Sequence, residues 1–147
     1  MMLGRIKAKV PDIFGSDDSG WAMACLPFAG GGMGLIGLPK VGSGVWIEFE
    51  QGDPDYPIWA GCWFGSASDL PSESLAPPYK KLLVKTEAGH SIILDDTPGV
   101  GGITLSTADG QKITLSSLGI QIDNGQGGKI ELTGPQVSVN SGALQVI

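Results

Sequence analysis

Apolar and polar residues alternate in short stretches along the first half of the chain. Ile6, Ala8 and Val10 alternate with basic residues, which is the period-two pattern of a half-buried strand. We expect further strands, separated by turns rich in glycine, proline and aspartate, at residues 21–26, 44–50 and 58–65. No stretch shows a sustained helical period. Short strands of this kind predict a small closed β-barrel, because closure removes exposed strand edges.

In the second half of the chain, apolar residues come as pairs that flank one outward position. The seven pairs are spaced 11, 10, 7, 10, 7 and 7 residues apart, and a glycine precedes each pair by one to three residues. The residue between the two apolar positions is polar in six pairs, and Ile93 is the exception. The pattern indicates an internal repeat of very short strands joined by tight corners. The pairs are Ile92/Leu94, Ile103/Leu105, Ile113/Leu115, Ile120/Ile122, Ile130/Leu132, Val137/Val139 and Leu144/Val146.

The distribution of aromatic residues separates these two halves. All ten aromatic residues lie within residues 1–79, and residues 80–147 contain no aromatic residue, cysteine or methionine. The core of the second half must therefore be narrow and filled by Ile, Leu and Val. Each strand offers about two apolar side chains on one face and nothing to cover them, so we expect three copies to wind about a common axis. A single-chain right-handed β-helix is the alternative, although its coils need about 20 residues each.

The predicted chain is all-β, with a C-terminal trimer core made from the repeated pairs. The residues expected in this core are Ile92, Leu94, Ile103, Leu105, Ile113, Leu115, Ile120, Ile122, Ile130, Leu132, Val137 and Val139.

Four motifs in the first half resemble, in order, the OB-fold of the central spike and baseplate assembly V family of contractile injection machines. They are GRIKAKVP at 4–11, CLPFAGGGMG at 25–34, LPKVGSGV at 38–45 and EQGDPDYPIWAG at 50–61. Each motif taken alone is a pattern typical of turns. In the last of them, the triplet Gly52–Asp53–Pro54 predicts a hairpin turn and carries no chemistry of its own. The motif residues that we single out are Gly30, Gly32, Pro39, Gly42, Gly52, Asp53 and Pro54.

The resemblance implies an N-terminal OB-fold barrel followed by a C-terminal intertwined trimeric β-helix. We place the OB-fold at residues 1–70, a linker at 71–81 and the spike at 82–147. The implied function is structural. A homotrimeric needle docks on a separate baseplate hub, is pushed through the target cell envelope and contacts the target membrane transiently. We expect its stiffness to come from continuous backbone pairing between chains and from a dry apolar axis.

The end of the repeat predicts an apolar tip formed by Leu144, Val146 and Ile147. Exposed apolar patches mark binding sites, and the resemblance suggests a conical PAAR-like protein as the cap. Some tips in the family hold iron through a His-x-His run, which does not occur here. We therefore expect no metal and no cofactor. The expected location is a virion tail baseplate or an injection-system particle.

Charge and hydropathy exclude several other classes of protein. No run of about 18 apolar residues could span a membrane as a helix, and the N-terminus has no apolar signal segment, so we expect synthesis in the cytoplasm. The net charge of −6 argues against binding to a nucleic-acid backbone. Because OB-folds also bind oligonucleotides and oligosaccharides, such a binding module is the alternative function. The side chains that could stack on bases are Trp21, Trp46, Trp59 and Trp63.

Candidate catalytic residues are few. His90 is the single histidine, and it falls on a predicted corner without the orienting partner that a nucleophilic triad needs. Asp95 and Asp96 could bind a cation, but two neighbouring carboxylates at a turn are more often solvated. The glycines at 30–32 lack the lysine and the helix of a phosphate-binding loop. We therefore expect no enzymatic activity.

The remaining candidates fall on predicted strands. Cys25 and Cys62 lie among apolar neighbours, where a thiol behaves as a small hydrophobe. Glu48 and Glu50 share one face of the strand at 44–50 with Trp46, and the alternate residues point into the barrel. This face is expected to be solvated or to contact another subunit, since a glycosidase needs two carboxylates across a sugar cleft.

Overall fold

The computed structural model describes residues 3–75, 77 and 80–146. The chain divides into two compact units, Met1–Asp69 and Leu70–Ile147. Strands dominate both units and the described helical segments are single turns, which confirms the predicted all-β class. None of the described helices has the length and apolar character needed to cross a membrane.

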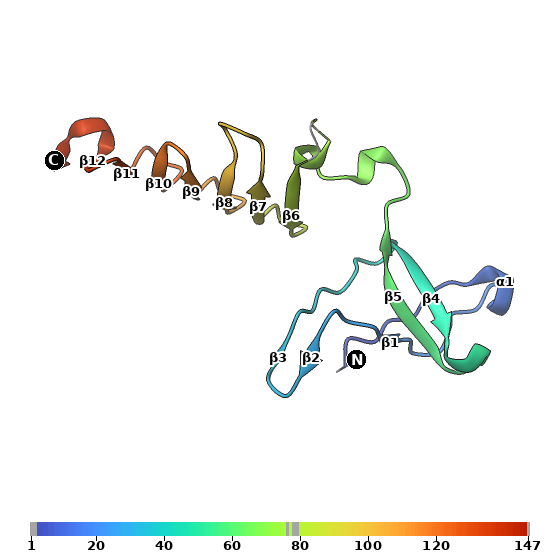
Figure 1. The fold of residues 1–147 in the computed structure, drawn as a ribbon. Coiled ribbons are helices and arrows are strands. Elements are labelled where there is room, and N and C mark those ends of the chain that lie inside the picture. The colour runs from blue at the N-terminus through green and yellow to red at the C-terminus, as the bar shows by residue number, and fades with distance from the viewer. Residues whose placement is uncertain (1–2, 76, 78–79, 147) are drawn as a thin grey trace. The chain divides into compact units, whose positions relative to one another are not determined.

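The N-terminal unit contains a three-stranded sheet in the order β1-β5-β4 and a separate two-stranded hairpin, β2-β3 (Figure 1). Strand β1 pairs parallel with β5, and β4 pairs antiparallel with β5. The strands are β1 (Met23–Ala24), β2 (Ala29–Gly30), β3 (Met33–Gly34), β4 (Gly44–Phe49) and β5 (Pro57–Trp63).

The first predicted strand and the closed barrel differ from what the described residues show. Residues 5–10 make only isolated bridges, Ile6 with Ala22 and Lys9 with Asp18. Pro11–Phe14 forms the single helical turn α1, because a proline fits the first position of a helix. Strand pairing among the described residues does not close a barrel, because the segment that follows β3 runs without a hydrogen-bonded strand partner until β4 begins.

The buried centre of this unit is small. The buried apolar residues among those described are Ala8, Ala22, Pro57 and Trp59. The Trp59 indole Nε1 donates a hydrogen bond to the Gly4 carbonyl at 2.9 Å, and the buried Ser19 hydroxyl accepts one from the Ala8 amide at 3.0 Å. These bonds satisfy the polar groups that burial would otherwise leave without water.

The β4–β5 ribbon is built as its alternation predicts. Val45, Ile47 and Phe49 are half-buried, whereas Trp46 and Glu48 face outward. The Phe49 ring packs edge-on against Phe14, with ring centroids 6.0 Å apart. A β-bulge lies between Trp46 and Ile47.

The turn between β4 and β5 also follows its prediction. It begins with the single turn η1 (Glu50–Gly52), in which Gly52 has a φ of +81°. The Asp53 carboxylate accepts a hydrogen bond from the Asp55 amide at 3.0 Å, and the Asp53 carbonyl accepts one from the Tyr56 amide at 3.0 Å. This is the arrangement by which Asp and Gly stabilise tight turns.

The C-terminal unit is one eight-stranded antiparallel sheet in which each strand pairs with its neighbours in the sequence (Figure 1). The single turns η2 (Ala67–Asp69) and η3 (Ser72–Ser74) precede the sheet, and η4 (Asn140–Gly142) joins its last two strands. The strands are β6 (Lys81–Lys85), β7 (Ser91–Asp95), β8 (Gly102–Ser106), β9 (Lys112–Ser116), β10 (Gly119–Asp123), β11 (Lys129–Thr133), β12 (Gln136–Val139) and β13 (Leu144–Val146).

The corners along one edge of this sheet share a polar cap. The Thr86 hydroxyl accepts a hydrogen bond from the His90 amide at 3.1 Å, and the Thr107 hydroxyl accepts one from the Gln111 amide at 3.2 Å. In the next corner on this edge, the Asn124 side-chain carbonyl accepts one from the Gly128 amide at 2.8 Å. Each cap closes a five-residue corner, so the structural repeat is a hairpin.

Backbone pairing of the described strands lies within one chain. Every strand from β7 to β12 is hydrogen-bonded on both sides to strands of the same chain. This differs from the expected pairing between chains. Short corners cause the difference, because they let each strand fold back on its predecessor before another chain can pair with it. Other copies can therefore contact this sheet mainly through its faces.

Candidate functional site

The predicted core residues lie on one face of the C-terminal sheet, in two columns that cross the strands. The pairing register aligns one residue of each strand with one of the next throughout both columns. The first column is Val84, Ile92, Leu105, Ile113, Ile122, Ile130, Val139 and Leu144. The second is Leu82, Leu94, Ile103, Leu115, Ile120, Leu132 and Val137, with Val146 next in register. We call these residues the apolar face.

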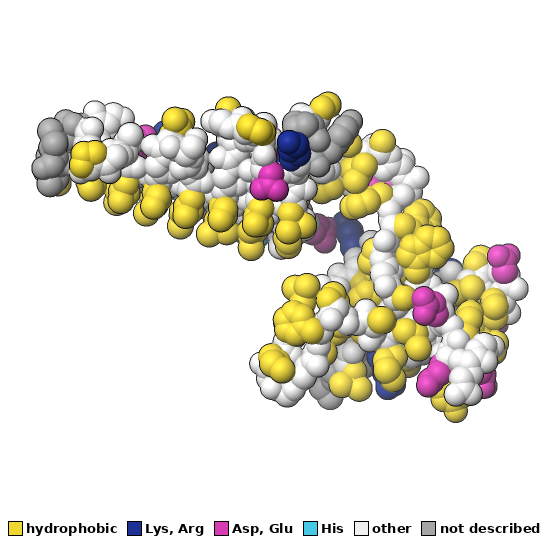
Figure 2. All heavy atoms as spheres, in the orientation of Figure 1, with side chains coloured by type: hydrophobic (Ala, Val, Ile, Leu, Met, Phe, Trp, Pro, Cys, Tyr) yellow, Lys and Arg dark blue, Asp and Glu magenta, His cyan; other side chains and the backbone are white. Residues whose placement is uncertain are grey.

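The apolar face stays substantially exposed among the described residues. From β7 to β11 its side chains keep between 36% and 44% of their surface exposed, and Leu82 and Leu144 keep 65% and 61%. Figure 2 shows the hydrophobic side chains as a continuous row along one side of the C-terminal unit. An apolar patch of this extent marks a contact surface.

Polar residues occupy the opposite face, as predicted for the middle positions. Thr104, Thr114, Gln121, Glu131 and Ser138 pair with one another across the strands. Two ion pairs reinforce this outer face, Lys81 Nζ with Asp95 Oδ2 at 3.4 Å and Lys129 Nζ with Asp123 Oδ2 at 3.2 Å.

Backbone and side-chain donors around these two carboxylates hold them in the charged form. Thr97 hydrogen bonds lower the pKa of Asp95, and Lys81 lowers it further. The Gly125 amide, which donates to Asp123 at 2.8 Å, is the main cause of the lowered pKa of Asp123, and Lys129 adds to it. Both carboxylates are therefore committed to stabilising corners of the sheet.

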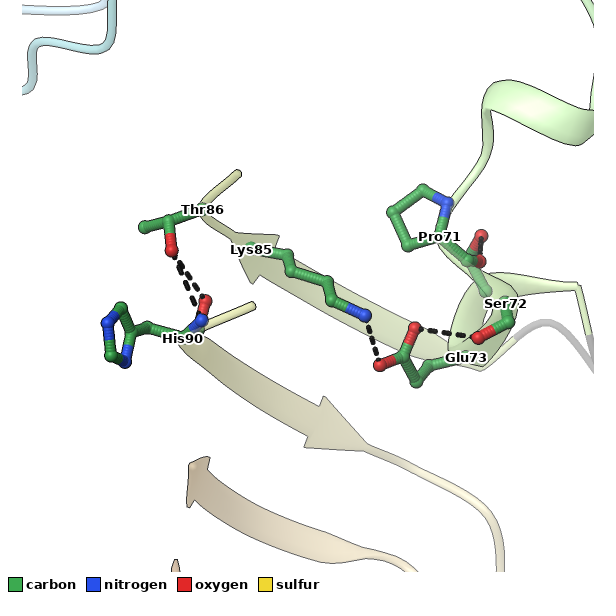
Figure 3. Close-up of polar contacts among 7 residues, drawn as sticks. Pro71, Ser72, Glu73, Lys85, Thr86 and His90 are labelled. Atoms are coloured by element: carbon green, nitrogen blue, oxygen red, sulfur yellow. Dashed lines mark hydrogen bonds and ion pairs between the residues drawn. The ribbon is translucent and has the colours of Figure 1, made fainter. Parts of the chain in front are cut away.

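Ile93, the exception in the sequence pattern, has a structural explanation. It pairs with Leu83 on the outer face, and both side chains are half-buried. The η3 turn is tied to this end of the sheet, because Lys85 Nζ lies 2.6 Å from Glu73 Oε1 (Figure 3). Glu73 and Ile93 line the same shallow depression of about 430 Å³. The outer face is thus apolar at Leu83 and Ile93, beside the turn that precedes the sheet.

Leu82 and Val84 extend the apolar face by one strand beyond the predicted pairs. The run Leu82–Leu83–Val84 hides the alternation, because its outward middle residue is itself apolar. The corner caps Thr86, Thr107 and Asn124 were also not anticipated. In each of these corners a glycine follows the threonine or asparagine by three residues, and this spacing would have predicted the cap.

The candidate catalytic residues take structural positions. His90 is exposed as predicted, and its Nδ1 accepts a hydrogen bond from the Ala108 amide at 3.2 Å, which links two corners. Asp95 ends strand β7 and is half-buried, so it is not the solvated loop residue that we expected. Within the described ranges no three His, Cys, Asp or Glu side chains gather as they would around a metal ion.

The cysteines and tryptophans of the N-terminal unit correct two expectations. Cys25 and Cys62 are free and exposed, rather than packed as small hydrophobes. Trp59 is 4% exposed and donates its indole N–H to Gly4, so it is not available to stack on a base. Trp46 and Trp63 are exposed and lie opposite Gly61 and Gly44 in the register.

The other singled-out residues lie in turns and at the end of the chain. Gly32 and Gly42 have φ of +74° and +91°, and Gly30 pairs with Met33 in the β2-β3 hairpin. Pro39 and Gly42 line an open depression of about 720 Å³ together with Trp63. Of the predicted tip, Leu144 is exposed, whereas the Val146 side chain and Ile147 lie outside the described residues.

Comparison with known proteins agrees with both halves of this architecture. The Type VI secretion system/phage-baseplate injector OB domain matches residues 1–64, and the phage baseplate V C-terminal trimerisation domain matches residues 81–145.

Curated relatives include spike proteins of type VI secretion systems. VgrG4b of Pseudomonas aeruginosa is 40% identical over 60 residues, covering 40% of this chain and 7% of the relative. VgrG5 of the same organism is 32% identical over 103 residues, covering 67% of this chain and 12% of the relative. The actin cross-linking toxin VgrG1 of Vibrio cholerae is 34% identical over 88 residues, covering 57% of this chain and 8% of the toxin.

The chain thus spans about a tenth of the length of these relatives. The OB domain comes first and the trimerisation domain second, with only a short connection between the two matched ranges. With an OB domain followed by a trimerisation domain, the chain belongs to the phage baseplate V family of spike proteins.

Proposed function

We propose that three copies of this chain pack their apolar faces around a common axis and form the central spike of a contractile injection machine. The observation that carries the proposal is a sheet whose strands β7 to β12 are paired on both sides within the chain and whose two apolar columns stay exposed among the described residues. The match to a trimerisation domain over the same strands supports three copies rather than two.

The dimensions of the sheet suit a three-sided arrangement. Its strands are mostly five residues long, which corresponds to about 17 Å at the usual rise per residue. The centre of an equilateral triangle with sides of about 17 Å lies about 5 Å from each side. Sheets that pack face to face lie about 10 Å apart, so each sheet's layer of side chains is also about 5 Å deep. Aliphatic side chains fill that depth, whereas an aromatic ring would be too large. This accounts for the absence of aromatic residues from residues 80–147.

Burial of the apolar face would stabilise the assembly. Complete burial of a Leu or Ile side chain contributes about 1.5–3 kcal/mol, so the part still exposed here is worth on the order of 1 kcal/mol per residue. The contribution recurs at every strand and in each of the three copies. The trimer is therefore expected to resist dissociation strongly.

The family and this geometry also suggest how the trimer docks, moves and is capped. We infer that the trimer docks on a separate baseplate hub and that sheath contraction pushes it through the envelope of the target cell, with transient contact with the target membrane. A PAAR-like protein is the proposed cap of the end that carries Leu144. The proposed location is the baseplate of a phage tail or of a type VI secretion particle.

Measuring the mass of the native full chain by light scattering tests the proposal. We expect three times the chain mass of 15.2 kDa and a band that resists SDS until the sample is heated. A monomer would contradict the proposed function. For the cap, we expect a PAAR-like protein from the same gene cluster to bind the trimer and to lose affinity for the variant Leu144→Ser, whose mass by light scattering should remain that of a trimer.

A further inference from the structure

The segment between β3 and β4 is apolar and exposed. Leu35, Ile36 and Leu38 keep 58%, 62% and 59% of their surface, and Val41 keeps 99%. Residues 33–39 carry no charged side chain. Single exposed apolar residues are ordinary on protein surfaces, but a contiguous stretch of them marks an interaction site.

The backbone in the middle of this segment lacks hydrogen bonds to other backbone groups. The Leu35 amide donates to the Phe28 carbonyl at 3.2 Å, and the Ser43 amide donates to Lys40 at 3.0 Å. Between them, in the described part of the chain, Ile36, Gly37 and Leu38 make no hydrogen bond with another backbone group. Nothing described lies within 4 Å of the position that a Cβ of Gly37 would take, so another backbone can approach there.

One side of the segment is already placed by the N-terminal unit. The ends of the Ile36 and Leu38 side chains approach the position of a Cβ on Gly4, at 3.4 Å and 3.9 Å. Among its described residues the unit buries just four apolar side chains, Ala8, Ala22, Pro57 and Trp59, so it has little interior of its own to hold the segment. An unpaired, apolar and partly anchored segment has the properties of a sheet edge that accepts a further strand or surface.

We infer that residues 35–41 contact the OB domain of a second copy of this chain. This rests on the proposed trimer, because the trimerisation domain keeps three OB domains attached within the reach of residues 64–80. A tether of that kind gives each OB domain an effective concentration of its neighbours on the order of millimolar. Lys40 is the one charged residue of the segment, which favours an apolar protein surface over nucleic acid or lipid head groups, because several basic residues together recognise those.

Site-specific photo-cross-linking of the full chain tests this contact. A benzophenone amino acid is placed at Leu35, or at Ile13 on α1, which is 49% exposed and serves as the matched control. Light scattering of the unsubstituted chain reports the trimer independently. We expect covalent dimers and trimers from the probe at Leu35, and only monomer from the probe at Ile13.

The two probes and the native mass of the unsubstituted chain separate the possible failures. A trimeric mass without cross-linking at Leu35 would overturn the OB contact and leave the trimer intact, with the segment then available to a different protein. A monomeric mass of the unsubstituted chain would overturn the proposed function itself. Equal cross-linking at Leu35 and Ile13 would also contradict the inference, because it would show unspecific contact between the OB domains.

Discussion

Lys85 Nζ lies 2.6 Å from Oε1 of Glu73, and this ion pair joins β6 to the η3 turn. Both side chains keep about a third of their surface exposed. The Ser72 hydroxyl also donates to Glu73, at 3.2 Å. The ion pair thus holds the turn that precedes the sheet against its first strand.

Neutralising Glu73 is expected to loosen this turn. In the variant Glu73→Gln the Lys85 ion pair is lost, and we expect faster hydrogen exchange at the Ser74 and Leu75 amides, which bond to Pro71 and Ser72. Glu131→Gln is the control, because it makes the same charge change on the outer face of β11. Equal exchange rates at η3 in wild type and Glu73→Gln would contradict the role of this ion pair.

The same ion pair predicts a dependence on pH. The hydrogen bond from Lys85 is the main cause that lowers the pKa of Glu73 below the ordinary value of a glutamate. A carboxyl group whose pKa is lower in the folded protein than in the unfolded chain stabilises the folded state at pH values above its unfolded pKa. This stabilisation is lost as the pH falls through the pKa of the folded state. Protection of the η3 amides, corrected for the intrinsic effect of pH on exchange, should therefore be constant near neutrality and fall in acid. The acid loss should be absent from Glu73→Gln.

Placing a charge on the apolar face should prevent assembly. In Leu115→Asp three carboxylates meet near one dry axis, and an unpaired buried charge costs several kcal/mol. We expect light scattering to show a monomer. The neighbouring Thr114→Asp changes the outward face of the same strand and should remain a trimer. Trimer formation by both variants would show that the apolar face is not the trimer core.

Gly119 is expected to be irreplaceable at the start of β10. It has a φ of +137°, and a Cβ there would overlap the Leu132 carbonyl oxygen of the next strand. Gly127 also has a positive φ, of +96°, but has open space around it. Alanine at Gly127 should cost about 1–2 kcal/mol from backbone strain alone. Thermal unfolding should show a clearly larger loss for Gly119→Ala, and equal losses would indicate that the backbone relaxes around the new methyl group.

Removing a corner cap should have a smaller effect. The Asn124 side-chain carbonyl accepts hydrogen bonds from the Gln126 and Gly128 amides, at 2.9 Å and 2.8 Å. We expect Asn124→Ala to lower the stability to unfolding by about 1–2 kcal/mol, since a hydrogen bond contributes about 0.5–1.5 kcal/mol net. Gln126→Ala in the same corner is the control and should be near neutral in denaturant titrations. A larger loss from Gln126→Ala would contradict the cap.

The period-two pattern predicted most of the C-terminal sheet because each of its strands has one polar and one apolar face. The pattern failed at Leu82 and Val84, where Leu83 makes the outer face apolar as well. Such a position cannot be recognised without knowing that another part of the chain, here the η3 turn, lies beside it. The pattern also could not predict which strands pair with one another. Alternation shows which face of a strand is buried, but not which strand lies next to it.

The N-terminal unit was less predictable for a related reason. Alternation at Ile6, Ala8 and Val10 suggests a strand, yet this segment makes only single bridges. The turn at Gly52 was predicted correctly because its geometry depends on a few adjacent residues. Trp59 shows the opposite case, since its burial depends on the distant Gly4 carbonyl. Local chemistry could be anticipated from the sequence, whereas contacts between distant segments could not.

The uniform register of the apolar columns has a consequence for length. Every layer of the sheet presents the same kind of aliphatic pair, so no single hairpin is needed to complete the cross-section. Deleting or duplicating a whole hairpin would change the sheet by about 10 Å along its axis and would keep both columns facing the same way. Removing a single strand would reverse the direction of all that follow. The reach of such a spike can therefore be adjusted in steps of two strands, with its thickness unchanged.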